Sequence, residues 1–344
     1  MKLRLHPQSL TLEFPFTIAR GSISRQRTLI VELEHEGHRG FGEAPESTYY
    51  GRTQDSISAS LQQCRDTIES LDFQHPTQLW QRLQAPLSED SFALSAVDQA
   101  AWDLFGKQQR KTTWELLELQ WGKVPDSSYT IGIDAIDVMV RKLKQHPQWP
   151  VYKIKLGTDH DVDIVRALRD TTSAAFRVDA NCGWSAEETI ACATQLKSLG
   201  VEFIEQPLPA NAPVEQHTTV YEQSALPLIA DESCVSEADV ESCAGRFHGI
   251  NVKLCKCGGL TPAVRMLRQA RELGLTTMVG CMVETSVGIS AAAQLLPLLD
   301  YADLDGAALL AVDPAHGVRV TNGHIEMGRG HGHGLSFPFQ QSQP

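Results

Sequence analysis

Apolar and polar residues alternate along the first 50 positions of the chain. Leu3 and Leu5 begin the pattern, which continues at 28–33 and, after a turn at 36–38, at 40–43. Alternation with a period of two, interrupted by turn residues, is typical of strands. The first segment is therefore predicted to form a meander.

From residue 53 to about 119 the apolar residues follow a helical spacing instead, most clearly over 91–104. Strands followed by helices predict an α+β domain. We assign this domain to residues 1–122.

After residue 122, short β-branched runs alternate with longer segments of helical spacing. Eight strands are predicted, at Tyr129–Ile133, Tyr152–Lys155, Phe176–Asp179, Phe203–Glu205, Leu228–Ala230, Ile250–Leu254, Thr276–Gly280 and Ala302–Leu304. Eight strands with helix-length spacers favour a (β/α) barrel over an open doubly wound sheet. No Gly-x-Gly-x-x-Gly follows the first of them, which weakens the dinucleotide-binding alternative. The barrel is assigned to residues 123–314.

Composition and charge narrow the class of protein. The chain has 344 residues and a formal net charge of -12 without a basic cluster, so we expect no nucleic-acid partner. No apolar run is long enough for a membrane span, and the N-terminus lacks the apolar stretch of a secretory signal. The expected location is the cytoplasm, and the eight cysteines are expected to be reduced thiols.

Two short segments have the residue types of a metal site. Cys255-x-Cys257 has no second pair to complete a tetrahedral zinc set. His331 and His333 lie in a Gly-rich run, where neighbours of glycine in a turn are the simpler interpretation.

Three carboxylates recur at one fixed interval. From Asp179 to Glu205 is 26 residues, and from Glu205 to Asp231 is again 26, about one strand plus one helix. The carboxyl ends of barrel strands form the active-site face, so these side chains are expected to lie side by side. An oxygen-only set suits Mg²⁺ or Mn²⁺ rather than zinc. The alternative is that each acid caps the helix after its strand.

Lys153 and Lys155 are two residues apart and share one face of a strand. Two ammoniums that are close together and partly desolvated each favour loss of a proton, so the pKa of at least one is expected to fall. Surface lysines on an exposed edge are the alternative, and it fits poorly beside the apolar Val151, Ile154 and Leu156.

A third lysine, Lys253, ends the sixth predicted strand, on the far side of a barrel from Lys155. Lys256 is expected in the following loop and is the weaker acid/base candidate. A metal flanked by two opposed lysines suits removal of a proton next to a carboxylate.

Five motifs together resemble the muconate-lactonizing subgroup of the enolase superfamily, over essentially the whole chain. They are Lys-x-Lys (153–155), Asp-Ala-Asn-x-Gly-Trp (179–184), Glu-Gln-Pro-Leu (205–208), Asp-Glu-Ser (231–233) and Asn-Val-Lys-Leu-x-Lys-x-Gly-Gly (251–259). The resemblance implies an α/β fold, a (β/α)7β TIM-like barrel. It also implies an α+β capping domain that the C-terminal segment 315–344 completes.

Within this subgroup, Asp303-Leu304-Asp305 is similar to the Asp-x-Asp signature of dipeptide epimerases, whose carboxylates hold the substrate's α-ammonium. Residues two apart on a strand share a face, as that role requires. Two solvated acids at a strand end are the alternative. Segments 16–22 and 280–282 are similar to those of L-Ala-D/L-Glu epimerases in particular.

Carried over residue by residue, the resemblance implies a full site. The implied Mg²⁺ ligands are Asp179, Glu205 and Asp231, and the implied acid/bases are Lys155 and Lys253. The implied substrate contacts are Lys153, Asp303, Asp305, Arg20, Thr130 and Cys281. Arg20 would pair with a glutamate side chain, Arg25 competes for that role, and either residue as a solvated charge is the alternative. Glu284 is a polar residue at the mouth without an assigned role.

The implied activity is Mg²⁺-dependent epimerisation of dipeptides by 1,1-proton transfer. The leading substrate is L-Ala-D/L-Glu, in the recycling of murein peptides of the cell wall. The alternatives are an epimerase of other dipeptides, a cycloisomerase or o-succinylbenzoate synthase-type enzyme, and a catalytically silent barrel. The expected partner is a small dipeptide, and the oligomeric state is open, with a homo-oligomer among the expected forms.

Overall fold

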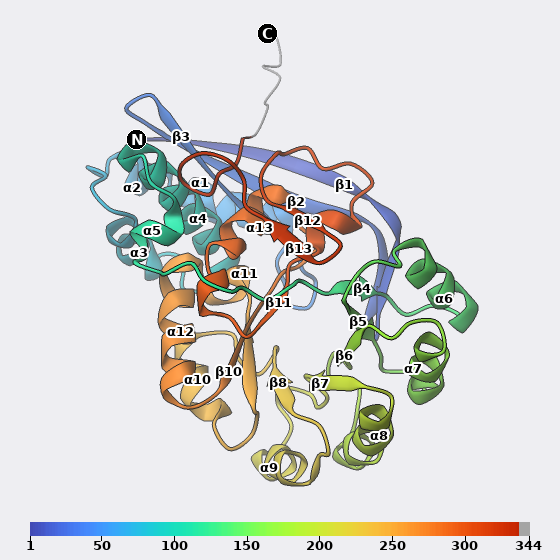
Figure 1. Cartoon of the computed structure of the whole chain (residues 1–344). Coiled ribbons are helices and arrows are strands. Elements are labelled where there is room, and N and C mark those ends of the chain that lie inside the picture. Colours follow the sequence, from blue (N-terminus) through green and yellow to red (C-terminus); the bar gives the residue numbers. More distant parts are fainter. Residues whose placement is uncertain (337–344) are drawn as a thin grey trace.

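The computed structural model describes residues 1–336 and divides into a sheet with helices and a barrel (Figure 1). The chain begins with an antiparallel sheet of three strands in sequence order: β1 (Lys2–Ile18), β2 (Gly21–His35) and β3 (His38–Pro45). The predicted meander is confirmed. Residues 19–20 form the turn between β1 and β2, at the end of a long hairpin.

Five helices follow this sheet, as the helical spacing predicted: α1 (Gln54–Gln63), α2 (Arg65–Glu69), α3 (Pro76–Gln84), α4 (Ser91–Gln109) and α5 (Thr113–Leu116). The longest, α4, lies directly against β3. Gly40 and Gly42 make this approach possible, because a Cβ on Gly42 would lie 2.1 Å from the carbonyl oxygen of Ala96 in α4.

The second part is a barrel of eight parallel strands in sequence order, at or within two residues of their predicted positions. They are β4 (Tyr129–Ile131), β5 (Val151–Lys155), β6 (Ala175–Asp179), β7 (Val201–Glu205), β8 (Leu228–Ala230), β9 (Gly249–Val252), β10 (Thr276–Gly280) and β11 (Tyr301–Asp303). The backbone N–H of Ser128, just before β4, donates to Ala302 O in β11 at 3.3 Å, which closes the ring.

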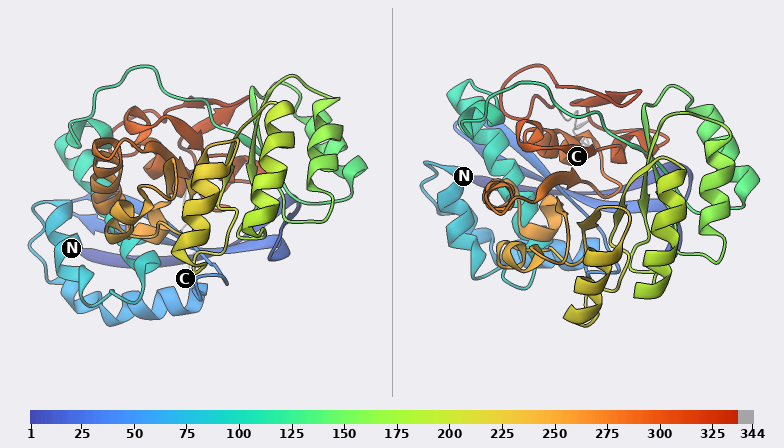
Figure 2. Two further views of the ribbon diagram at one scale, coloured as in Figure 1. Left: turned by 90° about the horizontal axis from the view of Figure 1, so that it is seen from below. Right: turned by 60° about the horizontal axis from the view of Figure 1, so that its bottom comes forward.

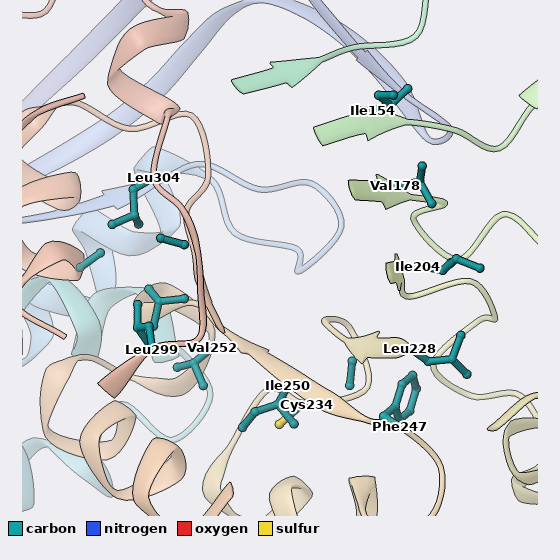
Figure 3. Packing of buried hydrophobic residues seen from close by; sticks show 14 of the residues in the cluster. Ile154, Val178, Ile204, Leu228, Cys234, Phe247, Ile250, Val252, Leu299 and Leu304 are labelled. Carbon is teal, nitrogen blue, oxygen red and sulfur yellow. The ribbon is translucent and has the colours of Figure 1, made fainter. Parts of the chain in front are cut away.

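Helices connect the strands and lie outside the barrel (Figure 2). They are α6 (Ile136–Gln145), α7 (Asp161–Arg169), α8 (Ala186–Ser198), α9 (Val214–Gln223), α10 (Glu237–Cys243), α11 (Leu254–Cys257), α12 (Leu260–Glu272) and α13 (Ser286–Ala293), with 3₁₀ turns η1 (Leu296–Leu298) and η2 (Gly306–Leu309). Seven strand–helix units followed by a last strand confirm the (β/α)7β fold. Ile154, Val178, Ile204 and Leu228 on successive strands belong to its main core (Figure 3).

The sixth barrel strand is shorter than predicted. It ends at Val252, and Leu254, predicted to be its last residue, is the first residue of α11. Lys253 stands between strand and helix as the N-cap, and Lys256 lies in α11 rather than in a loop. A single helical turn is too short to give the sequence a helical periodicity.

The helices of the N-terminal part dock on the barrel beside α11 and α12. Trp80 Nε1 donates a hydrogen bond to Gly258 O at 2.9 Å, and Trp102 Nε1 donates to Thr261 Oγ1 at 2.9 Å. From the sheet, the buried carboxylate of Glu43 accepts hydrogen bonds from Thr285 N and Oγ1 at the start of α13. These contacts fix the sheet above the carboxyl ends of the strands.

The C-terminal tail, with β12 (Arg319–Thr321) and β13 (His324–Glu326), also contacts the N-terminal part. His333 N donates to Asp103 Oδ1 in α4 at 2.8 Å, and Leu335 packs with Ile30 and Phe41. The division into domains at residues 122 and 314 stays a prediction. Across residues 1–336, every helix is too short or too polar to span a bilayer.

The close approach of β3 to α4 gives a stability prediction. Gly42→Ala is expected to lower the free energy of unfolding by about 1–3 kcal/mol, because the new methyl group overlaps the backbone of α4. Urea unfolding measures the change. Gly122→Ala is the matched control, since an added Cβ there meets nothing within 4 Å. Equal stability of the two variants would contradict the packing described.

Candidate active site

Three carboxylates meet at the carboxyl ends of three adjacent strands. Asp179 ends β6 and lies in register with Glu205, which ends β7, while Asp231 directly follows β8. One oxygen from each lies within 4.8 Å of the others, and all three side chains are buried. The 26-residue interval therefore brings the three predicted ligands to one point.

The surroundings of this triad suit a divalent cation. Glu205 Oε2 and the Oδ1 atoms of Asn181 and Asn251 are buried and accept no hydrogen bond. Burial, and then the charge of Asp179, raise the pKa of Glu205 to about 8. A hard cation would satisfy such oxygen acceptors and balance their charge.

Lys153 lies at the centre of the carboxylates. Its Nζ donates hydrogen bonds to Asp303 Oδ2 at 2.8 Å and to Glu205 Oε1 at 3.0 Å. It also forms ion pairs with Asp179 Oδ2 at 3.1 Å and with Glu205 Oε2 at 2.8 Å. Burial lowers its pKa, but the carboxylates outweigh burial and hold the pKa well above its usual value. Lys153 is therefore not a lysine whose pKa falls, because the nearby acids were not counted in that prediction.

The two other lysines approach the triad from opposite sides. Lys155 Nζ donates to Asp179 Oδ2 at 2.6 Å from β5, and Lys253 Nζ donates to Asp231 Oδ2 at 2.7 Å from the end of β9. Three strands lie between β5 and β9 in the sheet order. Burial lowers the pKa of Lys253, but Asp231, Glu205 and Glu232 together outweigh burial and raise it. A molecule at the triad would have one lysine on each side.

Asp303 and Asp305 stand beside this centre, where the barrel closes. Asp303 ends β11 and accepts hydrogen bonds from Lys153 Nζ and, at 2.7 Å, from Ser128 Oγ. Asp305 lies past the strand, at the N-cap of η2, so the strand argument for a shared face does not apply to it. Burial, and then the charge of Asp303, raise the pKa of Asp305 to about 7, which marks a position short of positive charge.

The remaining predicted substrate contacts differ in their surroundings. Thr130 N donates to Asp305 Oδ2 at 2.6 Å, so this residue positions that carboxylate. Burial raises the pKa of the Cys281 thiol, and the charges of Asp305 and Asp303 raise it further. Glu284 is buried and accepts a hydrogen bond from Met282 N at 2.9 Å. Burial, and then Glu43, raise the pKa of Glu284 to about 8.

The structure brings Arg20, but not Arg25, to the strand ends. Arg20 Nη2 is 2.7 Å from Glu232 Oε1, Nη1 donates to Asn181 O at 2.8 Å, and the guanidinium lies 4.1 Å from the centre of the Tyr49 ring. Arg25 is an exposed residue of β2, paired in register with Thr11.

Two residues around the triad were not assigned a positioning role from the sequence. Lys256 Nζ donates to Asp231 Oδ1 at 2.5 Å, to Asp231 O at 2.6 Å and to two further carbonyl oxygens, of Cys234 and Asn251. Gln206 Oε1 accepts from Asp231 N at 3.0 Å and from Ser233 N. Both residues belong to the motifs quoted from the sequence, but side chains that reach an adjacent loop leave no periodic signal.

The other candidate metal segments have structural partners. His333 is buried, with Nε2 2.9 Å from Gln99 O and Nδ1 3.0 Å from Thr113 Oγ1, and burial lowers its pKa to about 4. The Cys257 thiol donates to Gly259 O at 3.4 Å. Within residues 1–336, the triad is the one cluster of three acidic, His or Cys side chains arranged to hold a metal.

Two family models match the sequence. Residues 1–118 match the mandelate racemase / muconate lactonizing enzyme N-terminal domain, and residues 136–341 match the enolase C-terminal domain-like family. Together these ranges cover more than nine tenths of the chain.

Named relatives share most of the sequence. An L-Ala-D/L-amino acid epimerase of Flavobacterium johnsoniae is 50% identical over 98% of this chain and 100% of its own length. An L-Ala-D/L-Glu epimerase of Bacteroides thetaiotaomicron is 38% identical over 95% of this chain and 85% of its own. The solved structure of a dipeptide epimerase from Methylococcus capsulatus, complexed with Mg and L-Arg-D-Lys, is 30% identical, covers 98% of this chain and 100% of its own, and superposes with a TM-score of 0.90.

The contacts of Lys256 predict a role in metal binding. Lys256→Met is expected to weaken Mg²⁺ binding by about tenfold or more, because the Asp231 carboxylate and its loop lose their shared donor. Titration calorimetry measures the affinity without any turnover. Lys197→Met, on the exposed face of α8, is the control. Unchanged affinity in a folded Lys256 variant would exclude this role.

Proposed function

This chain belongs to the mandelate racemase / muconate lactonizing enzyme family of the enolase superfamily, and from that premise we propose that it is a Mg²⁺-dependent dipeptide epimerase. One observation carries the proposal. Lys155 and Lys253 flank a buried triad of carboxylates from opposite sides of the barrel. Two opposed bases are what inversion at one carbon requires, since the proton leaves one face and returns to the other.

Asp179, Glu205 and Asp231 are the residues that would hold Mg²⁺. The ion would supply positive charge to a substrate carboxylate, which stabilises the additional negative charge that develops when the α-proton leaves. Lys153, whose ammonium is buried among the same carboxylates, keeps its proton and supports that charge through hydrogen bonds. Lys155 and Lys253 take and return the α-proton, one on each face.

Asp303 and Asp305 identify the class of substrate. Asp305 is buried and short of a cationic partner, and its position next to Asp303 suits an α-ammonium group. A substrate with a carboxylate at the triad and an ammonium at this pair matches a dipeptide, whose second residue is epimerised. Substrates of related enzymes agree with this choice, including the dipeptide bound in the M. capsulatus structure.

L-Ala-D/L-Glu is the leading substrate, and both named relatives act on dipeptides that begin with L-Ala. Murein-peptide recycling, a cytoplasmic location and a homo-oligomer belong to the proposal as expectations. The second candidate is an o-succinylbenzoate synthase-type enzyme or a cycloisomerase. Such an enzyme would use the same proton abstraction on a carboxylate substrate that has no amine. The buried Asp303–Asp305 pair favours the first candidate.

Deuterium exchange tests the two-base arrangement. With Mg²⁺ in D₂O, the protein should exchange the Glu α-proton of L-Ala-L-Glu and form L-Ala-D-Glu. Lys155→Ala and Lys253→Ala should each lose epimerisation, while each keeps exchange for the epimer whose proton faces the remaining lysine. Mass spectrometry and ¹H NMR follow both processes. Absence of exchange with every dipeptide in a library would reject the proposal.

A substitution at Asp303 separates the two candidate activities. Asp303→Asn is expected to raise KM for L-Ala-L-Glu by about tenfold or more, because the α-ammonium loses an ionic partner in a buried site. Steady-state kinetics give the value, and Asp300→Asn at an exposed position is the control. An unchanged KM would favour a substrate without an amine.

A further inference from the structure

The turn between β1 and β2 reaches the site through one cation, Arg20. Its guanidinium bridges two strand-end loops, contacting Asn181 O after β6 and the Glu232 carboxylate after β8. The ring of Tyr49, from the loop after β3, lies against it at 4.1 Å. Arg20 thus lies next to the residues that follow the predicted metal ligands Asp179 and Asp231.

The partner of Arg20 is a buried acid. The side chain of Glu232 is 2% exposed, whereas that of Arg20 is 29% exposed. Glu232 Oε1 is taken by Arg20, and Oε2 is buried and accepts no hydrogen bond. Desolvation makes an acid in this position hold its cation tightly, since no water replaces the lost partner.

The other cations around the centre are already matched. Lys153, Lys155, Lys253 and Lys256 each form an ion pair with a carboxylate of the triad or with Asp303. The side chains of these lysines are at most 9% exposed. Among these five cations, the 29% exposed Arg20 is therefore the most accessible to a side-chain carboxylate that enters next to the triad. That cation is neutralised by Glu232.

We propose that Glu232 competes with the substrate for Arg20, and thereby makes the site tolerant of dipeptides with a neutral second residue. This inference rests on the proposed dipeptide epimerase function. A neutral side chain leaves the Arg20–Glu232 pair intact. An acidic side chain of the substrate can pair with Arg20 only by sharing it with Glu232. The buried negative charge of Glu232 then lies next to the substrate carboxylate.

The physical basis is a difference between two affinities. Selectivity for an acid over its isosteric amide depends on how much of the Arg20 charge is free, not on whether Arg20 is present. Because Glu232 neutralises the Arg20 charge, the site's affinities for the acidic side chain and for its amide differ little. Removal of the Glu232 charge would leave the Arg20 guanidinium without its acidic partner and available to bind an anion.

The isosteric pair L-Ala-L-Glu and L-Ala-L-Gln measures this selectivity directly. We expect Glu232→Gln to raise the ratio of kcat/KM for Glu over Gln by about tenfold, the effect of one charge-assisted hydrogen bond. Any loss of metal affinity next to Asp231 acts on both substrates and cancels in the ratio. Glu222→Gln, exposed at the end of α9, is the control. A rise of less than about threefold in Glu232→Gln would overturn the inference.

The double variant Arg20→Gln/Glu232→Gln gives an independent test. If the pair is neutral toward the substrate, replacing both members leaves the Glu:Gln ratio within about threefold of the wild type. If Arg20 instead serves the substrate carboxylate freely, the ratio falls by about tenfold, and the inference is wrong. Wild-type protein that exchanges the α-proton of neither dipeptide would reject the proposed function itself, which separates that failure from failure of this inference.

Discussion

The structure depends on a concentration of buried negative charge at one end of the barrel. Asp179, Glu205 and Asp231 place their carboxylates within 4.8 Å of one another, with Asp303 close by. Without compensation this cluster would be strongly unfavourable in a dry interior. Lysines balance it from β5, from the end of β9 and from α11, yet Glu205 Oε2 is buried and accepts no hydrogen bond. A divalent cation has a place here for that reason.

The rest of the fold serves to hold these charges in position. Parallel strands bring every carboxyl end to the same edge. Ile154 and Val178 on the strands belong to one core cluster with Ile164 of α7, which anchors the strands to the helices. Gln206 ties the loop after β7 to the loop after β8, and Lys256 ties β9 to Asp231. Asn181, Cys182 and Gln206 have positive φ although none is glycine, a strain that surrounding contacts at functional sites commonly support.

The same charge balance connects chemistry and selectivity. Every lysine at the centre has an acidic partner, so the pKa of Lys153 and of Lys253 is raised rather than lowered. At the mouth, the Arg20–Glu232 pair repeats the arrangement with a partly exposed cation and a buried acid. Each of these cations is thus paired with an acid, and a substrate carboxylate that reaches one of them must share it with that acid.

The sequence by itself determined the barrel, because strand and helix periodicities are local and recur over seven strand–helix units and a last strand. It also determined the triad and the opposed lysines, since each ends or directly follows a strand whose carboxyl end must face the site. The partners of these side chains were decided by tertiary structure alone. The helical position of Lys256, the pairing of Arg20 with Glu232 and the place of Asp305 beyond its strand depend on loops from different units. Contacts between such loops involve residues far apart in the chain, and no local pattern records them.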